Sequence, residues 1–285
     1  MDKFKYEIIS KSIKSVNEDI IYADENMAWV LDGATGLIDK NLTSYESDAK
    51  WFVTEWDKYL RNNLWDRSKS IKEIVLEGIG VIREIFYKEC DLVYVDEIKR
   101  PSASMSIVRK NKDIIEYFML GDCTLLIKDI KDIVVKVKDT TLEKFDNNAI
   151  SEMIKVKNEK NISAIEAREI VKPILIDNRL KKNKPEGYWI LEFNKDAVNH
   201  SIEGELIASD IKNLVLMSDG FAAIFDTYKY CTEDGLIDLL DEYGVKKVYE
   251  LIREIEEDDK DIIKYNRMKK GDDSSIVFIK NKEDV

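Results

Sequence analysis

Several residue types on which catalytic sites are often built are scarce in this sequence. Its 285 residues include one histidine, three cysteines and three prolines. A single histidine, His200, excludes the HExxH zinc site, which needs two, and the histidine-rich di-metal hydrolases. Any Ser-His-Asp or Cys-His arrangement would have to use His200.

The cysteines exclude a further class of protein. Cys90, Cys123 and Cys231 are odd in number and widely spaced, and no CxxC pair occurs. A disulfide framework or a structural zinc site is therefore not expected, and a reducing compartment fits better. The N-terminal MDKFKYEIIS lacks the apolar core of a signal peptide, and no apolar run approaches the ~18 residues of a membrane span. We expect a cytoplasmic protein that is not bound to a membrane.

The charge balance is acidic, with 57 Asp and Glu against 45 Lys and Arg and a formal net charge of -12. Without a basic excess to neutralise phosphates, no nucleic-acid partner is expected. The chain has no Pro-, Gly- or Ser-rich linker and no internal repeat, which favours one domain over residues 1–285. Its 44% hydrophobic residues are enough for a substantial core.

The hydrophobic patterns predict strands and helices in an order that is not an alternating βαβ series. Apolar residues recur at three- and four-residue spacing over 44–66 and 70–90, as on one face of a helix. Strands are predicted at 4–13, 27–32, 103–109, 113–120, 123–129, 132–138, 187–193, 212–217 and 275–280, and further helices within 140–182 and at 233–242 and 244–257. This order favours antiparallel sheets with helices packed outside them.

The informative acidic residues stand where apolar strands end. Asp32 follows AWVL, Asp122 follows YFMLG, Asp219 follows LVLMS, and Asp272 and Asp273 precede SSIVFI. A neighbouring glycine lets the backbone approach an ion closely, and its carbonyl can serve as a ligand. Several such strand ends brought together would form an oxygen-only site for a hard cation such as Mg²⁺ or Mn²⁺.

Each of these positions also has a simpler interpretation. Asp-Gly is a common turn. Of the three such pairs in the sequence, Asp234–Gly235 stands at a predicted helix start and is interpreted as a cap or turn. Glu18 and Asp19 precede an apolar stretch, and alone they could form a solvated turn. Lys14, four residues before Glu18, could anchor a phosphate oxygen or be a surface lysine. The joint placement at strand ends favours the metal site.

Five motifs in order resemble the metal-dependent protein phosphatases of the protein phosphatase 2C type, bacterial members included. They are NEDI at 17–20, VLDGATG at 30–36, SASMSIV at 102–108 with MLGDCTLLI at 119–127, VLMSDGF at 215–221 and GDDSSIVFI at 271–279. GYWIL at 187–191 is similar to a bacterial subgroup. With Lys14, the resemblance spans residues 14 to 279, which is nearly the whole chain.

The resemblance implies an α+β fold in which two antiparallel sheets are flanked by helix pairs, with 140–182 as a variable insert or flap. It implies hydrolysis of phosphoserine and phosphothreonine in proteins by water activated at two Mg²⁺ or Mn²⁺ ions, with a third, weaker ion beside them. The partner would be a phosphoprotein substrate of a Ser/Thr kinase. The implied metal ligands are Asp32, Gly33, Asp219 and Asp272, with Asp122 and Asp219 for the third ion, Glu18 and Asp19 acting through water, and Lys14 on the phosphate.

Some positions depart from the family pattern. Lys14 replaces an arginine, so a point charge stands where a bidentate group is usual. Ala34 replaces the histidine of many eukaryotic members, and Cys123 and Ser275 replace Ser and Thr. All the carboxylates remain, which favours an active enzyme. The alternatives are a weak or inactive phosphatase-like regulatory module and a two-metal nucleotide phosphohydrolase or nuclease.

A basic stretch and the single histidine lie outside these motifs. Lys181, Lys182 and Lys184 could steer an acidic phosphopeptide, although a solvated loop is the simpler interpretation. His200 is interpreted as a structural or surface histidine.

Overall fold

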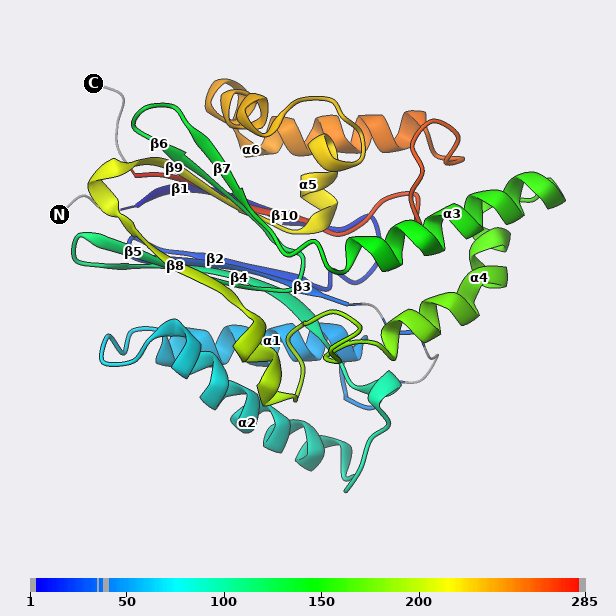
Figure 1. The fold of residues 1–285 in the computed structure, drawn as a ribbon, viewed down its shortest axis with the longest axis horizontal. Coiled ribbons are helices and arrows are strands. Elements are labelled where there is room, and N and C mark those ends of the chain that lie inside the picture. The colour runs from blue at the N-terminus through cyan, green and yellow to red at the C-terminus, as the bar shows by residue number, and fades with distance from the viewer. Residues whose placement is uncertain (1–3, 35, 38–40, 282–285) are drawn as a thin grey trace.

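Two antiparallel sheets face each other in a computed structural model that describes residues 4–34, 36–37 and 41–281 (Figure 1). Each sheet has five strands. The first sheet, in spatial order, is β1 Lys5–Lys11, β10 Ser274–Lys280, β9 Ile211–Met217, β6 Thr124–Asp129 and β7 Val134–Val137. The second is β2 Asp19–Ala23, β3 Met27–Gly33, β4 Ala103–Asn111, β5 Ile114–Leu120 and β8 Ile202–Ile207.

Helices cover the outer face of each sheet, as the resemblance implies (Figure 1). The second sheet packs on α1 Asp48–Asn63 and α2 Ile71–Cys90, and the first on α5 Asp219–Asp226 and α6 Glu233–Asp258. A third pair, α3 Glu143–Lys160 and α4 Ala164–Arg179, projects from one end of the two sheets. No helix among the described residues is long and apolar enough to cross a membrane. The expected α-β-β-α architecture is confirmed.

The two-residue period of the strands explains why acidic residues end up between the sheets. In β3, Met27, Trp29 and Leu31 pack toward α1 and α2, whereas Ala28 and Val30 belong to the core between the sheets. Successive side chains of a strand alternate between its faces, so Asp32 falls on the same face as Ala28 and Val30. The apolar layer between the sheets therefore ends at an aspartate.

The closing strand follows the same rule. Val277 and Ile279 of β10 lie in the core between the sheets, and Ile276 and Phe278 pack toward α5 and α6. Asp273, immediately before the strand, continues the inner set. Polar residues from both sheets thus cap one end of the same apolar layer.

Three elements were not predicted: β2, β8 and α5. The predicted strand over 187–193 is wrong, because this segment is irregular and makes only isolated bridges, at Ala103–Leu191 and Lys182–Tyr188. Tyr188, Leu191 and Phe193 are nevertheless buried, so their apolar composition reflects core packing rather than strand pairing. The two helices predicted at 233–242 and 244–257 are confirmed: they make up α6, and the non-helical backbone of Gly244, with φ 76° and ψ 164°, divides them.

The close approach of α5 to the start of β10 requires Gly220. A Cβ atom at this position would overlap the carbonyl oxygen of Asp273. We expect Gly220→Ala to lower the free energy of unfolding by about 1–3 kcal/mol, as overpacked sites do. Gly80→Ala in α2 is the matched control, because the nearest atom to its added Cβ, the Nζ of the flexible Lys195 side chain, is 3.5 Å away, an ordinary van der Waals contact. Urea unfolding measures both variants, and equal stability would contradict the argument.

Candidate metal centre

Two aspartates of the second sheet stand side by side at its end, and a third, Asp122, follows β5 close to them. Asp19 of β2 lies opposite Asp32 of β3, and Asp32 lies opposite Ser104 of β4. The Ser104 hydroxyl donates a hydrogen bond to the carboxylate of Asp122 and accepts one from its backbone N–H at 3.1 Å. The register of β2, β3 and β4, together with the Ser104 hydrogen bonds, therefore brings Asp19 close to Asp122, although about a hundred positions separate them in the sequence. Ser104 positions Asp122, a role that the sequence pattern did not reveal.

Gly33 keeps the N-terminal acidic motif close to β3. Its N–H donates to the carbonyl of Glu18 at 3.2 Å. A Cβ atom on Gly33 would stand only 2.6 Å from that carbonyl oxygen, well inside van der Waals contact. The Asp-Gly motif at 32–33 thus serves a close approach between β3 and the segment that precedes β2.

The first sheet contributes its acids from two adjacent strand ends. Asp219 is the first residue of α5, directly after β9, and Asp272 lies two residues before β10. Ser218 and Ser275 join these ends, because the Ser218 N–H donates to the Ser275 carbonyl and the Ser275 N–H donates to the Ser218 hydroxyl, each at 3.0 Å.

Asp273 ties the two sheets together. Its Oδ2 accepts the backbone N–H of Glu18 at 2.8 Å, and its Oδ1 accepts the hydroxyl of Ser12 at 2.5 Å. The side chain is buried. Asp273 therefore holds the segment before β2 against the start of β10. The sequence placed it beside Asp272 but gave no sign that its carboxylate is committed to backbone and hydroxyl donors.

The gathered carboxylates raise one another's pKa values. Burial, then repulsion from Asp19 and Asp219, raises the pKa of Asp32 well above its ordinary value. Burial and the Asp273 charge raise the pKa of Asp19 to about 7. Asp219 is more exposed, and partial loss of solvation with repulsion from Asp272 and Asp122 raises its pKa. Such shifts follow from holding several carboxylates close together with limited access to solvent.

Asp19 gives the clearest test of whether these residues fit a cation. Asp19 is 2% exposed, and both carboxylate oxygens are buried without a hydrogen bond of normal geometry, although the nearby hydroxyls of Ser275 and Ser218 moderate the rise in its pKa. A buried carboxylate left unpaired is costly, whereas a divalent ion or water molecules held by such an ion would satisfy it. Carboxylate oxygens are also the donors that Mg²⁺ and Mn²⁺ prefer. The residues present therefore fit a metal centre, although within the described part of the chain no three acidic, His or Cys side chains already close around one ion.

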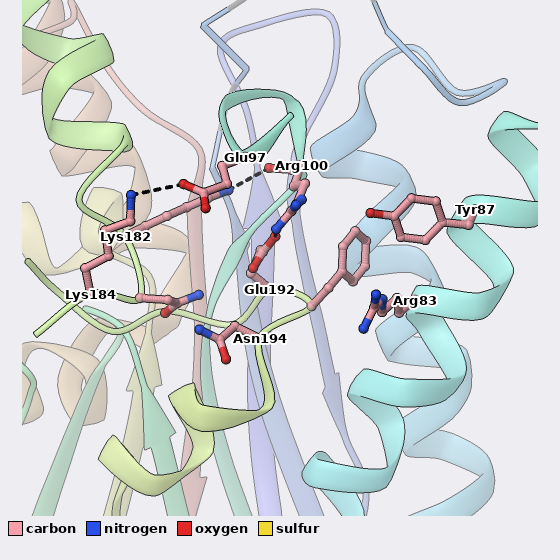
Figure 2. Close-up of a pocket in the computed structure, with 10 residues that line it drawn as sticks. Arg83, Tyr87, Glu97, Arg100, Lys182, Lys184, Glu192 and Asn194 are labelled. Carbon is pink, nitrogen blue, oxygen red and sulfur yellow. Dashed lines mark hydrogen bonds and ion pairs between the residues drawn. The ribbon is translucent and has the colours of Figure 1, made fainter. Parts of the chain in front are cut away.

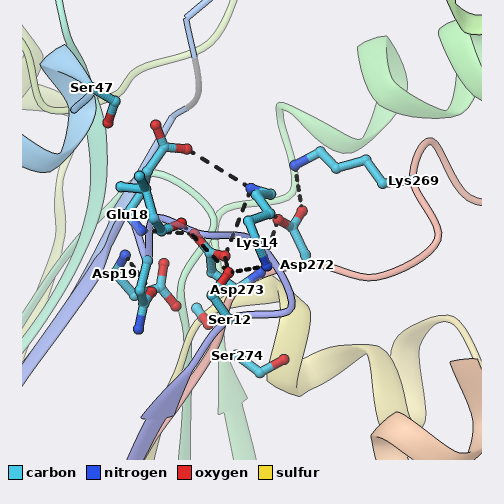
Figure 3. Close-up of polar contacts among 12 residues, drawn as sticks. Ser12, Lys14, Glu18, Asp19, Ser47, Lys269, Asp272, Asp273 and Ser274 are labelled. Atoms are coloured by element: carbon cyan, nitrogen blue, oxygen red, sulfur yellow. Dashed lines mark hydrogen bonds and ion pairs between the residues drawn. The ribbon is translucent and has the colours of Figure 1, made fainter.

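Two lysines occupy part of the space among these acids (Figure 3). The Nζ of Lys14 is 3.4 Å from Asp272 Oδ1, 3.7 Å from Asp273 Oδ1 and 3.9 Å from Glu18 Oε2. The Nζ of Lys269 is 2.6 Å from Asp272 Oδ2. Burial alone would raise the pKa of Asp272, but Lys269 and Lys14 hold it below its ordinary value. Lys14 thus lies at the cluster, as expected, and Lys269 is an addition that the sequence analysis missed.

The segment 140–182 also reaches the cluster. Asp146, near the start of α3, keeps surface open to solvent, yet the surrounding protein and repulsion from Asp122 and Asp219 raise its pKa to about 7. No sequence signal marked Asp146, because it lies in a polar helix far along the chain from the motifs.

The basic stretch after α4 is mostly committed to structure. Lys182 is buried and donates to the carbonyl of Arg100 at 2.8 Å, while Lys184 pairs with Glu97 at 3.0 Å (Figure 2). These residues line a polar cavity of about 220 Å³, with Arg83 and Tyr87 on α2 opposite. Lys181 pairs with Asp177 at 2.6 Å. The solvated-loop interpretation is therefore wrong for Lys182.

The remaining residues singled out in the sequence lie outside the acidic cluster. His200 is exposed and stacks on Trp189, with ring centroids 3.6 Å apart. Cys123 is buried in the core between the sheets. The Ala34 N–H donates to the Ser102 carbonyl at 2.9 Å. Thr35, within the VLDGATG motif, lies outside the described residues.

Several solved structures share this fold, serine/threonine phosphatases among them. The serine/threonine phosphatase PstP/Ppp of Mycobacterium tuberculosis superposes with a TM-score of 0.57 at 14% identity, over 99% of this chain and 100% of the other. PppA of Pseudomonas aeruginosa gives 0.56 at 12% identity, over 98% and 99%. A catalytic domain of PstP in complex with two manganese ions gives 0.52 at 13% identity, over 98% and 99%. At identities this low, the structural likeness establishes the fold alone.

The family follows from the sequence itself. The family model described as protein phosphatase 2C matches residues 14–253. A comparison with curated proteins finds no match. The chain therefore belongs to the protein phosphatase 2C family.

The raised pKa values predict how the stability of the metal-free protein changes with pH. Asp19, which is buried, has a pKa of about 7 when folded, against an ordinary 3.8. Because the folded state holds this proton more tightly, its stabilising contribution is complete below about pH 4 and is lost as the pH rises through about 7. We expect the melting temperature in EDTA to fall through this window, as thermal unfolding at a series of pH values would show.

Asp19→Asn tests the assignment. This variant should melt at a higher temperature than wild type at pH 7.5 in EDTA and gain less from added Mn²⁺. Asp238→Asn, whose parent side chain on α6 is 67% exposed, is the control and should follow wild type. An Asp19→Asn variant that melts below wild type would contradict the prediction.

Proposed function

We propose that this protein hydrolyses phosphate monoesters of serine and threonine in proteins, with Mg²⁺ or Mn²⁺ as its cofactor. The observation that carries the proposal is the convergence of Asp19, Asp32 and Asp219 at one end of a protein phosphatase 2C fold, with both oxygens of Asp19 buried without a hydrogen bond of normal geometry. Support also comes from the fold relative that was solved with two manganese ions.

The chain offers donors for a pair of ions and for a third. When bound, such ions lower the pKa of a water molecule and offset the charge of the phosphate. Proteins with this chemistry need no histidine, which agrees with a chain that has only His200. The proposed donors are the carboxylates of Asp32, Asp219 and Asp272, the carbonyl of Gly33, Glu18 and Asp19 toward water, and Asp122 with Asp219 for the third ion.

Lys14 is the proposed contact for the substrate phosphate. Its side chain is 33% exposed and its Nζ is shared among three carboxylates at 3.4 to 3.9 Å, so no single short ion pair holds it. It can therefore turn toward a phosphate oxygen as a point charge. Ala34 supplies no proton, so the leaving oxygen must take its proton from water.

We further propose that residues 1–285 act as one catalytic domain, in the cytoplasm, on proteins phosphorylated by a Ser/Thr kinase. Helices α3 and α4 project beside the acidic end of the sheets (Figure 1), and Asp146 is close enough to sense the charges of Asp122 and Asp219. This placement supports the interpretation of 140–182 as a flap that contacts the substrate.

Removal of a central carboxylate should abolish turnover. We expect Asp32→Asn and Asp219→Asn to lower kcat for p-nitrophenyl phosphate with Mn²⁺ by at least ~10³-fold, because each loses a charged oxygen that holds the ions, while Asp238→Asn keeps wild-type activity. Near-normal turnover by either variant would show that the site is wrongly assigned.

Assays with several substrates distinguish the alternatives. Wild-type protein should act on a phosphoserine peptide and not on DNA or nucleotides. Binding of Mn²⁺ without turnover of any substrate would favour a regulatory module, for which the occupation of Asp272 by two lysines is the supporting observation.

Lys14 should affect substrate binding more than turnover. We expect Lys14→Met to raise KM for a phosphoserine peptide by about tenfold, the equivalent of ~1.4 kcal/mol, with a smaller change in kcat. Lys14→Arg should retain the wild-type KM. An unchanged KM in Lys14→Met would remove Lys14 from the substrate site.

A further inference from the structure

Lys269 is held in place by an ordered loop between α6 and β10. Asp259, at the end of α6, accepts the backbone N–H groups of Ile263, Lys264 and Tyr265 at 2.8 to 3.0 Å. It also pairs with Arg267, whose guanidinium donates to the Asp259 carbonyl at 2.7 Å. This buried network ends at Arg267, two residues before Lys269. It therefore fixes the backbone from which the Lys269 side chain extends toward Asp272.

Asp272 has no free oxygen in this arrangement. Its Oδ2 is 2.6 Å from the Nζ of Lys269. Its Oδ1 accepts the backbone N–H of Asp273 at 3.0 Å and lies 3.4 Å from the Nζ of Lys14. Asp19 is the opposite case, with two buried oxygens and no hydrogen bond of normal geometry. The acid that opens the last motif is thus already neutralised from within the chain.

The same ammonium group acts on the neighbouring acids. Burial alone would lower the pKa of Lys269, but the negative charge of Asp272, and after it the charges of Asp219 and Asp32, raise it. A divalent ion bound by these three carboxylates would share Asp272 with the ammonium, and like charges close together in a partly buried site repel each other. Lys269 and such an ion therefore compete for the same negative charge.

We propose that Lys269 is an internal cation that competes with the divalent ion for Asp272, so that this chain binds its metal more weakly than its carboxylates alone would allow. The inference rests on the proposed function, because it takes Asp32, Asp219 and Asp272 as metal ligands. Lys14 does not have this role to the same degree, since its shortest ion pair is 3.4 Å and its charge is spread over three carboxylates. Without metal, Lys269 stabilises the fold by offsetting part of the acidic charge.

Measurement of Mn²⁺ binding tests the proposal directly. Isothermal titration calorimetry and the electron paramagnetic resonance signal of free Mn²⁺ would compare wild type with Lys269→Met, which removes the charge, and Lys269→Arg, which keeps it. The control is Lys270→Met, since Lys270 pairs with Glu257 at 2.5 Å and its side chain is 46% exposed. We expect Lys269→Met to bind Mn²⁺ at least tenfold more tightly, and Lys269→Arg and Lys270→Met to stay within threefold of wild type.

Thermal unfolding provides a second readout. In EDTA, Lys269→Met should melt below wild type, and saturating Mn²⁺ should raise its melting temperature by more than it raises that of wild type. Equal Mn²⁺ affinity in Lys269→Met and wild type would overturn the inference while leaving the metal centre intact. Weaker binding by Lys269→Met would overturn it too, because Lys269 would then be positioning Asp272 for the ion. Absence of Mn²⁺ binding in every protein would overturn the proposed function itself, and this inference with it.

Discussion

Mutual repulsion among carboxylates at one end of the layer between the sheets is the constraint on which the rest of the structure depends. Asp19, Asp32 and Asp219 are held close together, although loss of solvation and the charges of neighbouring carboxylates raise the pKa of each. Such an arrangement persists only where packed strands determine the positions of the acids. The apolar residues of β3, β9 and β10 supply that packing, and cations must supply the charge.

The fold meets this constraint with rigid supports. Asp273 gives both its oxygens to the segment before β2, and Ser104 orients Asp122. Close approaches at Gly33 and Gly220 bring the acidic motifs together where any side chain would keep them apart. The positive charge comes from two sources: lysines of the chain in the metal-free protein, and divalent ions in the working enzyme that we propose. Competition between Lys269 and the ions for Asp272 then determines how tightly the protein binds the divalent metal.

Much of the fold could be predicted from pattern. Alternating apolar residues predicted β3 and β10, and helical spacing predicted α1 and α2. The segment 187–193 was wrongly predicted as a strand because Tyr188, Leu191 and Phe193 are apolar for the sake of core packing, and composition does not distinguish that from pairing in a sheet. Helix α5 was missed because it has only eight residues, and its run from Gly220 to Phe225 is apolar with no alternating polar face.

The sequence by itself determined the α-β-β-α architecture and the protein phosphatase 2C family, and it supplied the candidate acids, because strand-end aspartates beside glycines are local features. Only the tertiary structure decided what each acid does. Asp19 is buried without a hydrogen bond of normal geometry, Asp273 braces two sheets, and Asp272 is bound by Lys269 and Lys14. Charges interact through space, so the pKa and the partners of a carboxylate depend on residues far away in the sequence. Lys14 and Asp272, for example, form an ion pair although they are 258 positions apart. No local pattern in the chain encodes that distance.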